Sequence, residues 1–431
     1  MKIAVIGFGA ASIGFIKGMV DSGKIENSTI DVFERGKSIE KSGFGGLKYD
    51  GKIFVSKEMG GDLDVPLNIQ REIVNYYLEK SNLAKKEGNK YIYSNELERG
   101  LSFKDEEFYK KFYSKGFQPI KSEFYHIGTD ELGNTVNNIY QSFKSHKNIN
   151  FFFDKNIKKI EKDENGAYVV IENKKIKYDK IIIGVGRSGH KLVNNLISNN
   201  KNLVLSNNMV DLGVRFELPN HIVEELNKKM YEFKVRLKTK TGYTVRTFCN
   251  NPSGEVTIEK YDDFVTVNGH ANASYKTSNT NFAILVSHSF TNPFNDPIGY
   301  GTHMAKLSNI LAGGEKVILQ AYEDFKNTNR TKKLGRVEPT LNFNNYILGD
   351  LNLVFPRKTI DSIIDFMEKL NEVIPGITYA DNLLYGVEVK FYGNKIDNNY
   401  FEDIKIIGDG SGWTRSITYA SCHGYMVATS L

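Results

Sequence analysis

The chain has 431 residues, of which 40% are hydrophobic and 25% are charged, and its formal net charge is +6. This composition is typical of a globular protein of roughly two to three domains, and it excludes collagen-like and largely disordered architectures. Two cysteines and the absence of any apolar run of ~18 residues argue against a disulfide-stapled fold, a Cys-rich zinc site and a membrane-spanning helix. We therefore expect a cytoplasmic protein with no membrane partner.

The N-terminal segment has the pattern of a nucleotide-binding βαβ unit. An apolar run over 3–6 is typical of a strand covered on both faces, and Gly7-Phe8-Gly9-Ala10-Ala11-Ser12 follows it as a G-x-G-x-x-G pattern that ends in Ser. Gly7 allows a tight turn, Gly9 lets a pyrophosphate approach the main chain, and Ser12 is small enough for close helix–strand packing. The helix N-terminus that follows would offer N–H groups to the phosphates.

A carboxylate at the end of the second strand (29–33) would complete the unit. Glu34 can accept hydrogen bonds from ribose hydroxyls, and it would repel a 2′-phosphate, so the pattern disfavours NADP. The motif itself does not separate FAD from NAD. The residues assigned to the dinucleotide here are Gly7, Gly9, Ala10, Ala11, Ser12, Glu34 and Arg35.

The middle of the chain continues with mixed elements. Gly45 and Gly46 lie in a glycine-rich stretch, where they either let the backbone approach the cofactor or only form a turn. Helical spacing is found over 67–88 and 129–146. The strands expected next are 149–153, 157–160, 167–171, 174–178 and 180–183, the last ending in Gly184-Val185-Gly186.

From 211 to 335 short runs separated by polar turns predict a mainly antiparallel sheet. Its expected strands are 214–218, 243–248, 254–259, 264–268 and 282–287. A last apolar strand (404–407) precedes Gly408-Asp409-Gly410-Ser411-Gly412, and a helix runs from about Arg415 to the end. We predict a discontinuous nucleotide domain over 1–210 and 336–431, with a helical excursion near 65–120, and an inserted substrate domain over 211–335.

Four segments resemble two-domain flavoproteins of the glutathione-reductase and hydroxybenzoate-hydroxylase type: IAVIGFGAASIG, FERG, KYDKIIIGVGRSG and IKIIGDGSGWTRSITYASCHG. Val185 stands where these proteins usually have Thr. HIGTDEL, DLGVRFELP, TFCNNPSGEV, VNGHANAS and LLYGVEVK resemble more closely a prokaryotic family of FAD-dependent dehydrogenases. That family commonly has CxCPGG where this chain has Cys249-Asn250-Asn251-Pro252-Ser253-Gly254, so a second cysteine is absent. The resemblance implies a Rossmann-like α/β FAD-binding domain with an inserted, mainly antiparallel α+β domain, and FAD as the cofactor.

The resemblance also implies contacts to the flavin half of the cofactor. Asp409 would accept a hydrogen bond from a ribityl hydroxyl, although a plain helix cap is an alternative role. The helix expected from Trp413-Thr414-Arg415 would direct its N–H groups to the flavin, and Arg415 would either add a charge there or lie at the surface. Ile157 would offer its backbone to adenine or belong to the core. The further residues assigned to FAD are Gly45, Gly46, Ile157, Gly184, Gly186, Asp409, Gly412, Trp413, Thr414 and Arg415.

The sequence gives only weak candidates for catalysis. Arg215 and His288 lie on expected strands of the inserted domain, and Glu388 lies in LLYGVEVK, so each could face the flavin. The histidines show no metal-ligand spacing, and we expect no metal.

The leading hypothesis is an FAD-dependent oxidoreductase, of the dehydrogenase kind, that exchanges a hydride or electrons with a small organic substrate in an interdomain cleft. A second complete G-x-G-x-x-G is missing, so NAD(P)H would dock transiently or another carrier would serve. One rival is a flavoprotein that modifies tRNA, with Lys234, Arg236, Lys238, Lys240 and Arg246 as a basic face. A solvated strand face explains these residues more simply, and we do not expect a nucleic-acid partner. Another rival is a non-catalytic FAD-binding sensor.

Overall fold

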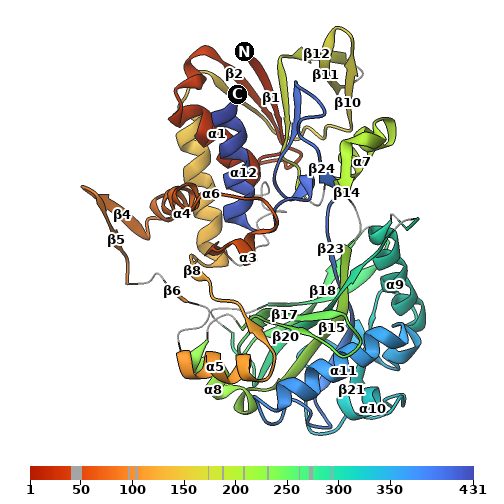
Figure 1. Cartoon of the computed structure of the whole chain (residues 1–431). Coiled ribbons are helices and arrows are strands. Elements are labelled where there is room, and N and C mark those ends of the chain that lie inside the picture. The colour runs from red at the N-terminus through yellow and green to blue at the C-terminus, as the bar shows by residue number, and fades with distance from the viewer. Residues whose placement is uncertain are drawn as a thin grey trace. The chain divides into compact units, whose positions relative to one another are not determined.

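The chain forms two compact units. The computed structural model describes residues 1–39, 51–95, 98–101, 105–172, 174–186, 189–206, 209–230, 233–261, 263–270, 275–291, 293–294 and 296–431. Unit 1 comprises Met1–Gly100, Ser122–Asn207 and Tyr392–Leu431, and unit 2 comprises Leu101–Lys121 and Asn208–Phe391. Each unit is drawn with its labelled elements in Figure 1.

Unit 1 is built on a five-stranded sheet of order β25-β13-β1-β2-β9 in which every neighbouring pair is parallel. The inner strands β1, β2 and β13 are almost wholly buried and mostly apolar, as both faces of a covered parallel sheet require. The five strands are β1 (Lys2–Ile6), β2 (Thr29–Phe33), β9 (Ile149–Phe152), β13 (Lys180–Ile183) and β25 (Ile404–Ile406).

Helices cover one face of this sheet. α1 (Ala10–Asp21) and α12 (Ile417–Ser430) lie side by side (Figure 1) because glycines remove the side chains between them. A Cβ on Gly424 of α12 would overlap the main chain of Ala11 and would lie 2.7 Å from the Phe15 nitrogen. α4 (Leu67–Lys80) and α6 (Thr129–Lys144) contribute side chains to the same core. The N-terminal and C-terminal segments of the chain thus pack into a single core.

The other face packs against a three-stranded antiparallel sheet, β10 (Lys159–Asp163), β11 (Gly166–Ile171) and β12 (Lys174–Tyr178), and α7 (His190–Asn199). The helix expected over 67–88 ends at Lys80, because the chain turns at Asn82 with a positive φ and enters a hairpin. The other elements in the described residues of unit 1 are η1 (Lys24–Asn27), β3 (Lys52–Val55), α3 (Lys57–Gly60), β4 (Ala84–Glu87), β5 (Lys90–Tyr93), β6 (Glu98–Leu101), β8 (Glu123–His126), η4 (Lys201–Leu203), β14 (Val204–Ser206), β24 (Lys395–Ile396) and η8 (Gly408–Ser411).

Unit 2 is built on an eight-stranded sheet of order β22-β21-β23-β15-β20-β17-β16-β7, and its central pairs are antiparallel, as expected from the sequence. Only β21 and β22 pair in parallel. The strands are β7 (Gln118–Pro119), β15 (Met209–Pro219), β16 (Val235–Lys238), β17 (Thr244–Asn251), β20 (Asn279–Ser289), β21 (Val317–Ala321), β22 (Tyr346–Leu348) and β23 (Leu383–Phe391).

The two faces of this sheet differ in character. On β15, Leu212, Val214 and Phe216 point into a large apolar core, whereas the alternating residues Asp211 and Arg215 point to the other face. Helices cover the apolar face: α5 (Glu106–Ser114), α8 (Glu224–Lys229), α9 (Pro297–Leu311), α10 (Tyr322–Lys326) and α11 (Arg357–Asn371). The hairpin of β18 (Glu255–Lys260) and β19 (Val265–His270) packs on part of the polar face, where it meets Leu383 and Tyr385. Three short 3-10 turns complete the unit: η5 (Asn220–Ile222), η6 (Phe343–Asn345) and η7 (Leu351–Leu353).

Two of the predicted domain boundaries differ from these units. The segment 336–391 belongs to unit 2, because β23 is hydrogen-bonded between β15 and β21 and α11 packs into the same core. The stretch 101–121 also belongs to unit 2, since β7 pairs with β16 and α5 buries Phe108 and Phe112 there. The predicted helical excursion near 65–120 is therefore only partly helical and is divided between the units. No helix in the described part of the chain combines the length and apolarity needed to cross a membrane.

Candidate functional site

Three glycine turns meet at one edge of the unit 1 sheet. Because β1, β13 and β25 run in parallel, their carboxyl ends lie at the same edge. Gly7 has a φ of +88°, and a Cβ there would lie 2.9 Å from the carbonyl oxygen of Gly184 at the end of β13. Gly408, after β25, has a φ of +69°, and its Cβ would lie 2.6 Å from that of Ala11 in the first turn of α1. The turns therefore surround the start of α1, where parallel α/β sheets bind dinucleotides.

The first turn of α1 is open to an anion. Gly9 is the N-cap, its backbone is extended, and no side chain caps the helix. Uncapped N–H groups at Ala10 and Ala11 with the positive end of the helix dipole favour a phosphate. Ser12 is fully buried, and its hydroxyl has no hydrogen-bond partner among the described residues. A buried hydroxyl left unpaired costs about 1–3 kcal/mol, so a ligand oxygen at this turn fits the site.

Glu34 joins the glycine turn to the end of β2. It is 7% exposed; Oε2 accepts the Phe8 N–H at 2.8 Å and Oε1 accepts the Gly36 N–H at 2.8 Å. Each carboxylate oxygen keeps a further acceptor position, so ribose hydroxyls can be accommodated as well. The sequence pattern did not indicate this second, structural role in closing the turn. Arg35 is exposed beside it.

The turn after β25 presents Asp409 at the same edge. Its Oδ1 accepts the Thr414 hydroxyl at 2.9 Å, and a Cβ on Gly410 would lie 3.2 Å from the Gly186 oxygen. Gly412, with a φ of +75°, closes the turn. β25 and β2 are separated by β13 and β1, so Asp409 and Glu34 lie roughly 14 Å apart along the edge. An extended FAD molecule can span such a distance, with the adenosine ribose at Glu34 and the ribityl chain at Asp409.

The expected helix start near Trp413 is wrong. α12 begins at Ile417, and the Ser416 hydroxyl caps it by accepting the Tyr419 N–H at 3.3 Å. The preceding residues instead pair with the segment after α3: the Trp413 carbonyl accepts the Asp62 N–H at 2.9 Å, and Thr414 bridges to Gly61. These residues therefore do not supply free helix N–H groups.

Arg415 shares the carboxylate of Asp62 with Lys395. Its guanidinium lies 3.4 Å from Asp62 Oδ2 and 4.3 Å above the Tyr392 ring. The indole nitrogen of Trp413 donates to the Ile396 carbonyl at 2.8 Å. Arg415 is exposed and paired, which favours the surface role over the predicted added charge at the flavin.

His423 of α12 supports the turn that carries Asp409, a role that the sequence analysis did not assign to it. Its Nδ1 lies 3.2 Å from the Gly408 nitrogen, and its Nε2 lies 3.3 Å from the Asn398 amide nitrogen. Burial lowers the pKa of His423 to about 4, so the ring is neutral at physiological pH. Burial raises the pKa of the neighbouring Cys422 to about 12, which makes this thiol a packing group and not a nucleophile.

The remaining residues that the sequence assigned to the cofactor are Ile157, Gly186, Gly45 and Gly46. Ile157 lies before β10 and not in a strand, and its buried side chain belongs to the core beneath that sheet. Gly186 has a φ of +60° in the turn after β13. Gly45 and Gly46 lie outside the described residues.

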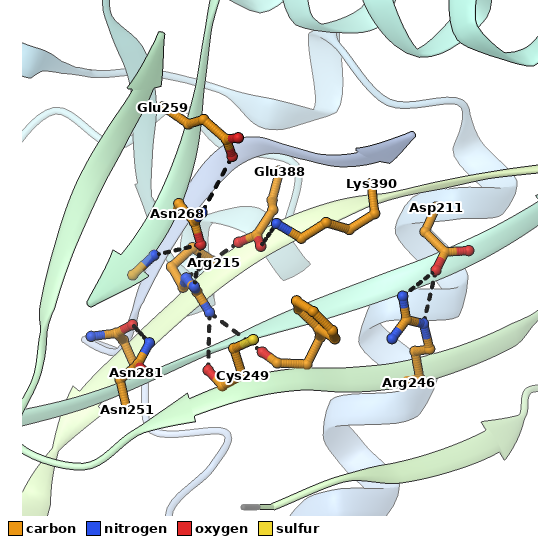
Figure 2. Close-up of polar contacts among 12 residues, drawn as sticks. Asp211, Arg215, Arg246, Cys249, Asn251, Glu259, Asn268, Asn281, Glu388 and Lys390 are labelled. Atoms are coloured by element: carbon orange, nitrogen blue, oxygen red, sulfur yellow. Dashed lines mark hydrogen bonds and ion pairs between the residues drawn. The ribbon is translucent and has the colours of Figure 1, made fainter. Parts of the chain in front are cut away.

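Arg215 and Glu388 form a buried ion pair on the polar face of unit 2. Both side chains are 0% exposed, and Arg215 Nε lies 3.2 Å from Glu388 Oε2 (Figure 2). Lys390 Nζ lies 3.2 Å from Glu388 Oε1. Arg215 also donates to Asn268 Oδ1 at 3.0 Å and to the carbonyls of Phe248 and Cys249 at 3.4 and 3.3 Å. These contacts fix the guanidinium in one position.

His288 lies on the opposite face of the same sheet. It pairs with Val210 on β15, whereas Ala283 pairs with Arg215, and an odd spacing along a strand reverses the face. Its Nε2 lies 2.9 Å from the Thr359 hydroxyl of α11, and burial lowers its pKa. The three catalytic candidates therefore do not form a single site, and His288 belongs to the helix-covered core. Among the described residues, no group of His, Cys, Asp and Glu has the arrangement of a metal site.

Comparison with known proteins identifies the class of unit 2. Residues 210–391 match a family model described as FAD-dependent protein, C-terminal domain-like. This match covers less than half of the chain, and it confirms the predicted relation to FAD-dependent proteins and FAD as the cofactor. No curated protein has a matching sequence.

Several solved structures resemble the whole chain weakly. The 2,6-dihydroxypyridine-3-hydroxylase from Arthrobacter nicotinovorans has a TM-score of 0.39 and 13% identity over 99% of this chain and 81% of its own. The probable FAD-dependent monooxygenase pqsL from Pseudomonas aeruginosa has a TM-score of 0.38 and 11% identity over 100% and 84%. CtdE in complex with FAD has a TM-score of 0.36 and 8% identity over 100% and 83%. Similarity at this level does not indicate a shared activity.

Proposed function

We propose that this chain is an FAD-dependent oxidoreductase that exchanges a hydride or electrons between its flavin and a small organic substrate. One observation carries the proposal: the glycine turns after β1, β13 and β25 and the carboxylates Glu34 and Asp409 lie along one edge of one parallel sheet. When bound, FAD supplies hydride or single-electron chemistry that side chains lack.

The chain's own groups would hold the cofactor in three ways. The uncapped start of α1 binds the diphosphate, with Gly7 and Gly9 leaving room for close approach. Glu34 accepts hydrogen bonds from the adenosine ribose and Asp409 from the ribityl chain. His423, held neutral by burial, fixes the turn that positions Asp409. The proposal assigns the substrate contacts to the polar face of unit 2, where Arg215 fixes Glu388 and the Phe248–Cys249 backbone.

The electron donor in this proposal is NAD(P)H that docks transiently, or another electron carrier. In the part of the chain that the structure describes, Cys249 and Cys422 form no disulfide, and the proposed chemistry does not use a dithiol relay.

A pair of glycine variants tests the cofactor site. Gly7→Ala introduces a Cβ at a positive φ against the Gly184 carbonyl, and we expect the purified protein to lose bound FAD. Gly23→Ala is the matched control, because Gly23 also has a positive φ (+69°), at the other end of α1, with nothing within 4 Å of an added Cβ. Equal FAD content in both variants and in the parent protein would contradict the assigned site.

Anaerobic reduction tests the activity itself. The holoprotein should show two visible absorption bands that bleach when NADH, NADPH or a member of a metabolite library is added. Tight FAD binding without bleaching by any reductant or substrate would contradict the oxidoreductase and favour the sensor.

A further inference from the structure

Two buried hydroxyl groups form a chain of hydrogen bonds that ends on the first residue of α1. The Ser421 hydroxyl of α12 donates to the Ala10 carbonyl at 2.8 Å, and the Tyr77 hydroxyl of α4 lies 2.9 Å from the Ser421 hydroxyl. Because Ser421 has one hydroxyl hydrogen and donates it to Ala10, Tyr77 is the donor in the second bond. Burial raises the pKa of Tyr77, so its phenol keeps the proton that this bond needs. The bonds thus connect α4, α12 and α1 (Figure 1) at the turn assigned to the diphosphate.

Ser421 differs from an ordinary hydroxyl side chain in a helix. Such side chains commonly bond to a carbonyl three or four residues earlier in their own helix, as the Thr429 hydroxyl of α12 does with the Tyr425 carbonyl at 3.1 Å. Ser421 instead donates to the neighbouring helix. The two helices touch there through their main chains, because a Cβ on Gly14 of α1 would lie only 1.8 Å from the Ser421 carbonyl oxygen. The bond from Ser421 to Ala10 therefore depends on this particular contact and is not a general property of a helical serine.

The Ala10 carbonyl belongs to the same peptide group as the Ala11 N–H. A trans peptide group is planar, and its C=O and N–H point in opposite directions, so a partner that fixes the carbonyl also fixes the N–H. The Ala11 N–H is one of the uncapped donors at the start of α1. The hydroxyl groups of Ser421 and Tyr77 therefore act, through Ala10, on a donor that is assigned to the cofactor phosphates.

Burial strengthens this effect. Tyr77 and Ser421 are both 0% exposed, so neither hydroxyl can exchange its partner for solvent. Hydrogen bonds in such surroundings are stronger than in water, and bonds in series polarise one another. A bond to the Ala10 carbonyl polarises its peptide group and makes the Ala11 N–H a better donor to a phosphate oxygen.

We propose that Ser421 and Tyr77 are positioning residues of the FAD site, which hold the first peptide group of α1 so that the Ala11 N–H is directed at the diphosphate. This inference rests on the cofactor site of the proposed function and adds to it two residues that lie outside the glycine motif. The competing interpretation is that the two hydroxyls only stabilise the packing of α4 and α12 on α1. That role would affect every ligand of the site equally, whereas the positioning role acts on ligands that carry the diphosphate.

Ligand affinities of the full-length, FAD-free protein separate the two roles without using catalysis. FAD and ADP carry the diphosphate and are titrated directly, whereas adenosine lacks it and is measured by its competition with FAD. Ser421→Ala should weaken the binding of FAD and ADP by about three- to tenfold and leave the affinity for adenosine unchanged. Tyr77→Phe keeps the ring and the bond from Ser421 to Ala10, so we expect a smaller loss with the same selectivity. Because Tyr77 acts through Ser421, the double variant should have the affinities of Ser421→Ala alone.

Ser81→Ala is the matched control. Ser81 is a 2% exposed serine at the end of α4, and its hydroxyl donates to the Leu78 carbonyl of that helix at 2.7 Å. This variant also removes a buried bond from a hydroxyl to a carbonyl in unit 1, but the bond does not reach α1. We expect all three affinities to be those of the parent protein. Thermal unfolding of each variant shows that it is folded.

The outcomes distinguish failure of this inference from failure of the proposed function. Unchanged affinities in Ser421→Ala, or equal weakening of FAD, ADP and adenosine, would overturn the positioning role while the FAD site stands. A parent protein that binds neither FAD nor ADP would overturn both. A selective loss of FAD and ADP in Ser421→Ala, in a protein whose flavin no donor or substrate bleaches, would support the positioning role and refute the oxidoreductase.

Discussion

Replacing Glu34 by Gln separates its two roles, which are closing the glycine turn and holding the ribose. Both carboxylate oxygens accept backbone N–H groups at 2.8 Å, from Phe8 and from Gly36. A carboxamide has one oxygen and one NH₂ group, so whichever way it turns, one of these N–H donors faces another donor.

The expected cost follows from this geometry. A hydrogen bond to a charged group contributes about 1.5–3 kcal/mol, and a buried donor left unpaired costs about 1–3 kcal/mol. Since Glu34 is buried, we expect the free energy of unfolding of the FAD-free protein to fall by about 2–4 kcal/mol. Loss of the charged acceptor for the ribose hydroxyls should also weaken FAD binding by about ten- to a hundredfold.

Asp179→Asn is the matched control for this variant. Asp179 Oδ2 accepts the Lys2 N–H at 2.7 Å, so it too is a carboxylate that binds a backbone N–H of β1, but at the amino end of the strand. Asp179 is exposed, and a single Asn oxygen can keep its bond, so we expect a smaller loss of stability and an unchanged FAD affinity. Denaturant unfolding of the FAD-free protein and fluorescence titration with FAD measure the two effects.

Either half of the reasoning can fail. FAD affinity in Glu34→Gln equal to that of Asp179→Asn would show that Glu34 only closes the turn and does not hold the ribose. An unchanged stability with reduced FAD affinity would show that the two backbone hydrogen bonds contribute little.

The other predictions concern buried polar groups and helix packing. Glu388→Gln leaves the buried charge of Arg215 without its carboxylate partner, so the free energy of unfolding of unit 2 in denaturant should fall by about 3–5 kcal/mol. Adding Arg215→Met to this variant should recover part of the loss, and additive effects of the two substitutions would contradict the pairing. In the unfolded chain His423 takes up a proton below its ordinary pKa of 6.5, whereas in the folded protein its pKa is lowered to about 4. Its contribution to the free energy of unfolding is therefore complete above pH 6.5, and about 3 kcal/mol is lost as the pH falls to 4. His423→Gln should flatten the dependence of the free energy of unfolding on pH in that window, and an unchanged slope would refute the assignment. Gly424→Val should force α12 away from Ala11 and reduce both thermal stability and FAD content, and normal values of both would show that the helix contact is dispensable.

The parallel sheet of unit 1 could be predicted from the sequence because its signals are local. Each strand is a short apolar run, and the G-x-G-x-x-G pattern and Glu34 follow strands directly. The arrangement of Gly184 and Gly408 around α1 follows once the strands are taken as parallel neighbours, since their carboxyl ends must share an edge.

The errors arose where tertiary contacts decide a local conformation. The residues before Ile417 look like the first turn of a helix, but Thr414 pairs with Gly61 instead, and the helix begins at Ile417 with Ser416 as its cap. The boundary near 335 failed because β23, the strand that completes the centre of the unit 2 sheet, comes long after the other central strands in the chain. Sequence texture cannot show that a distant strand inserts between two others.

The same physical difference explains why one site was visible in the sequence and the other was not. A parallel sheet covered on both faces leaves only its edge for a ligand, and an edge is built from turns, where glycine and acidic residues stand together in short motifs. An antiparallel sheet can keep one face polar, and a face collects single residues from several strands, each two positions from the next. Arg215 and His288 seemed equivalent in the sequence because each is a polar residue in or next to a strand that is otherwise mostly apolar. Their register places Arg215 beside Glu388 on the polar face and His288 under α11, so for unit 2 the pairing of strands, and not any motif, decides which face a polar residue occupies.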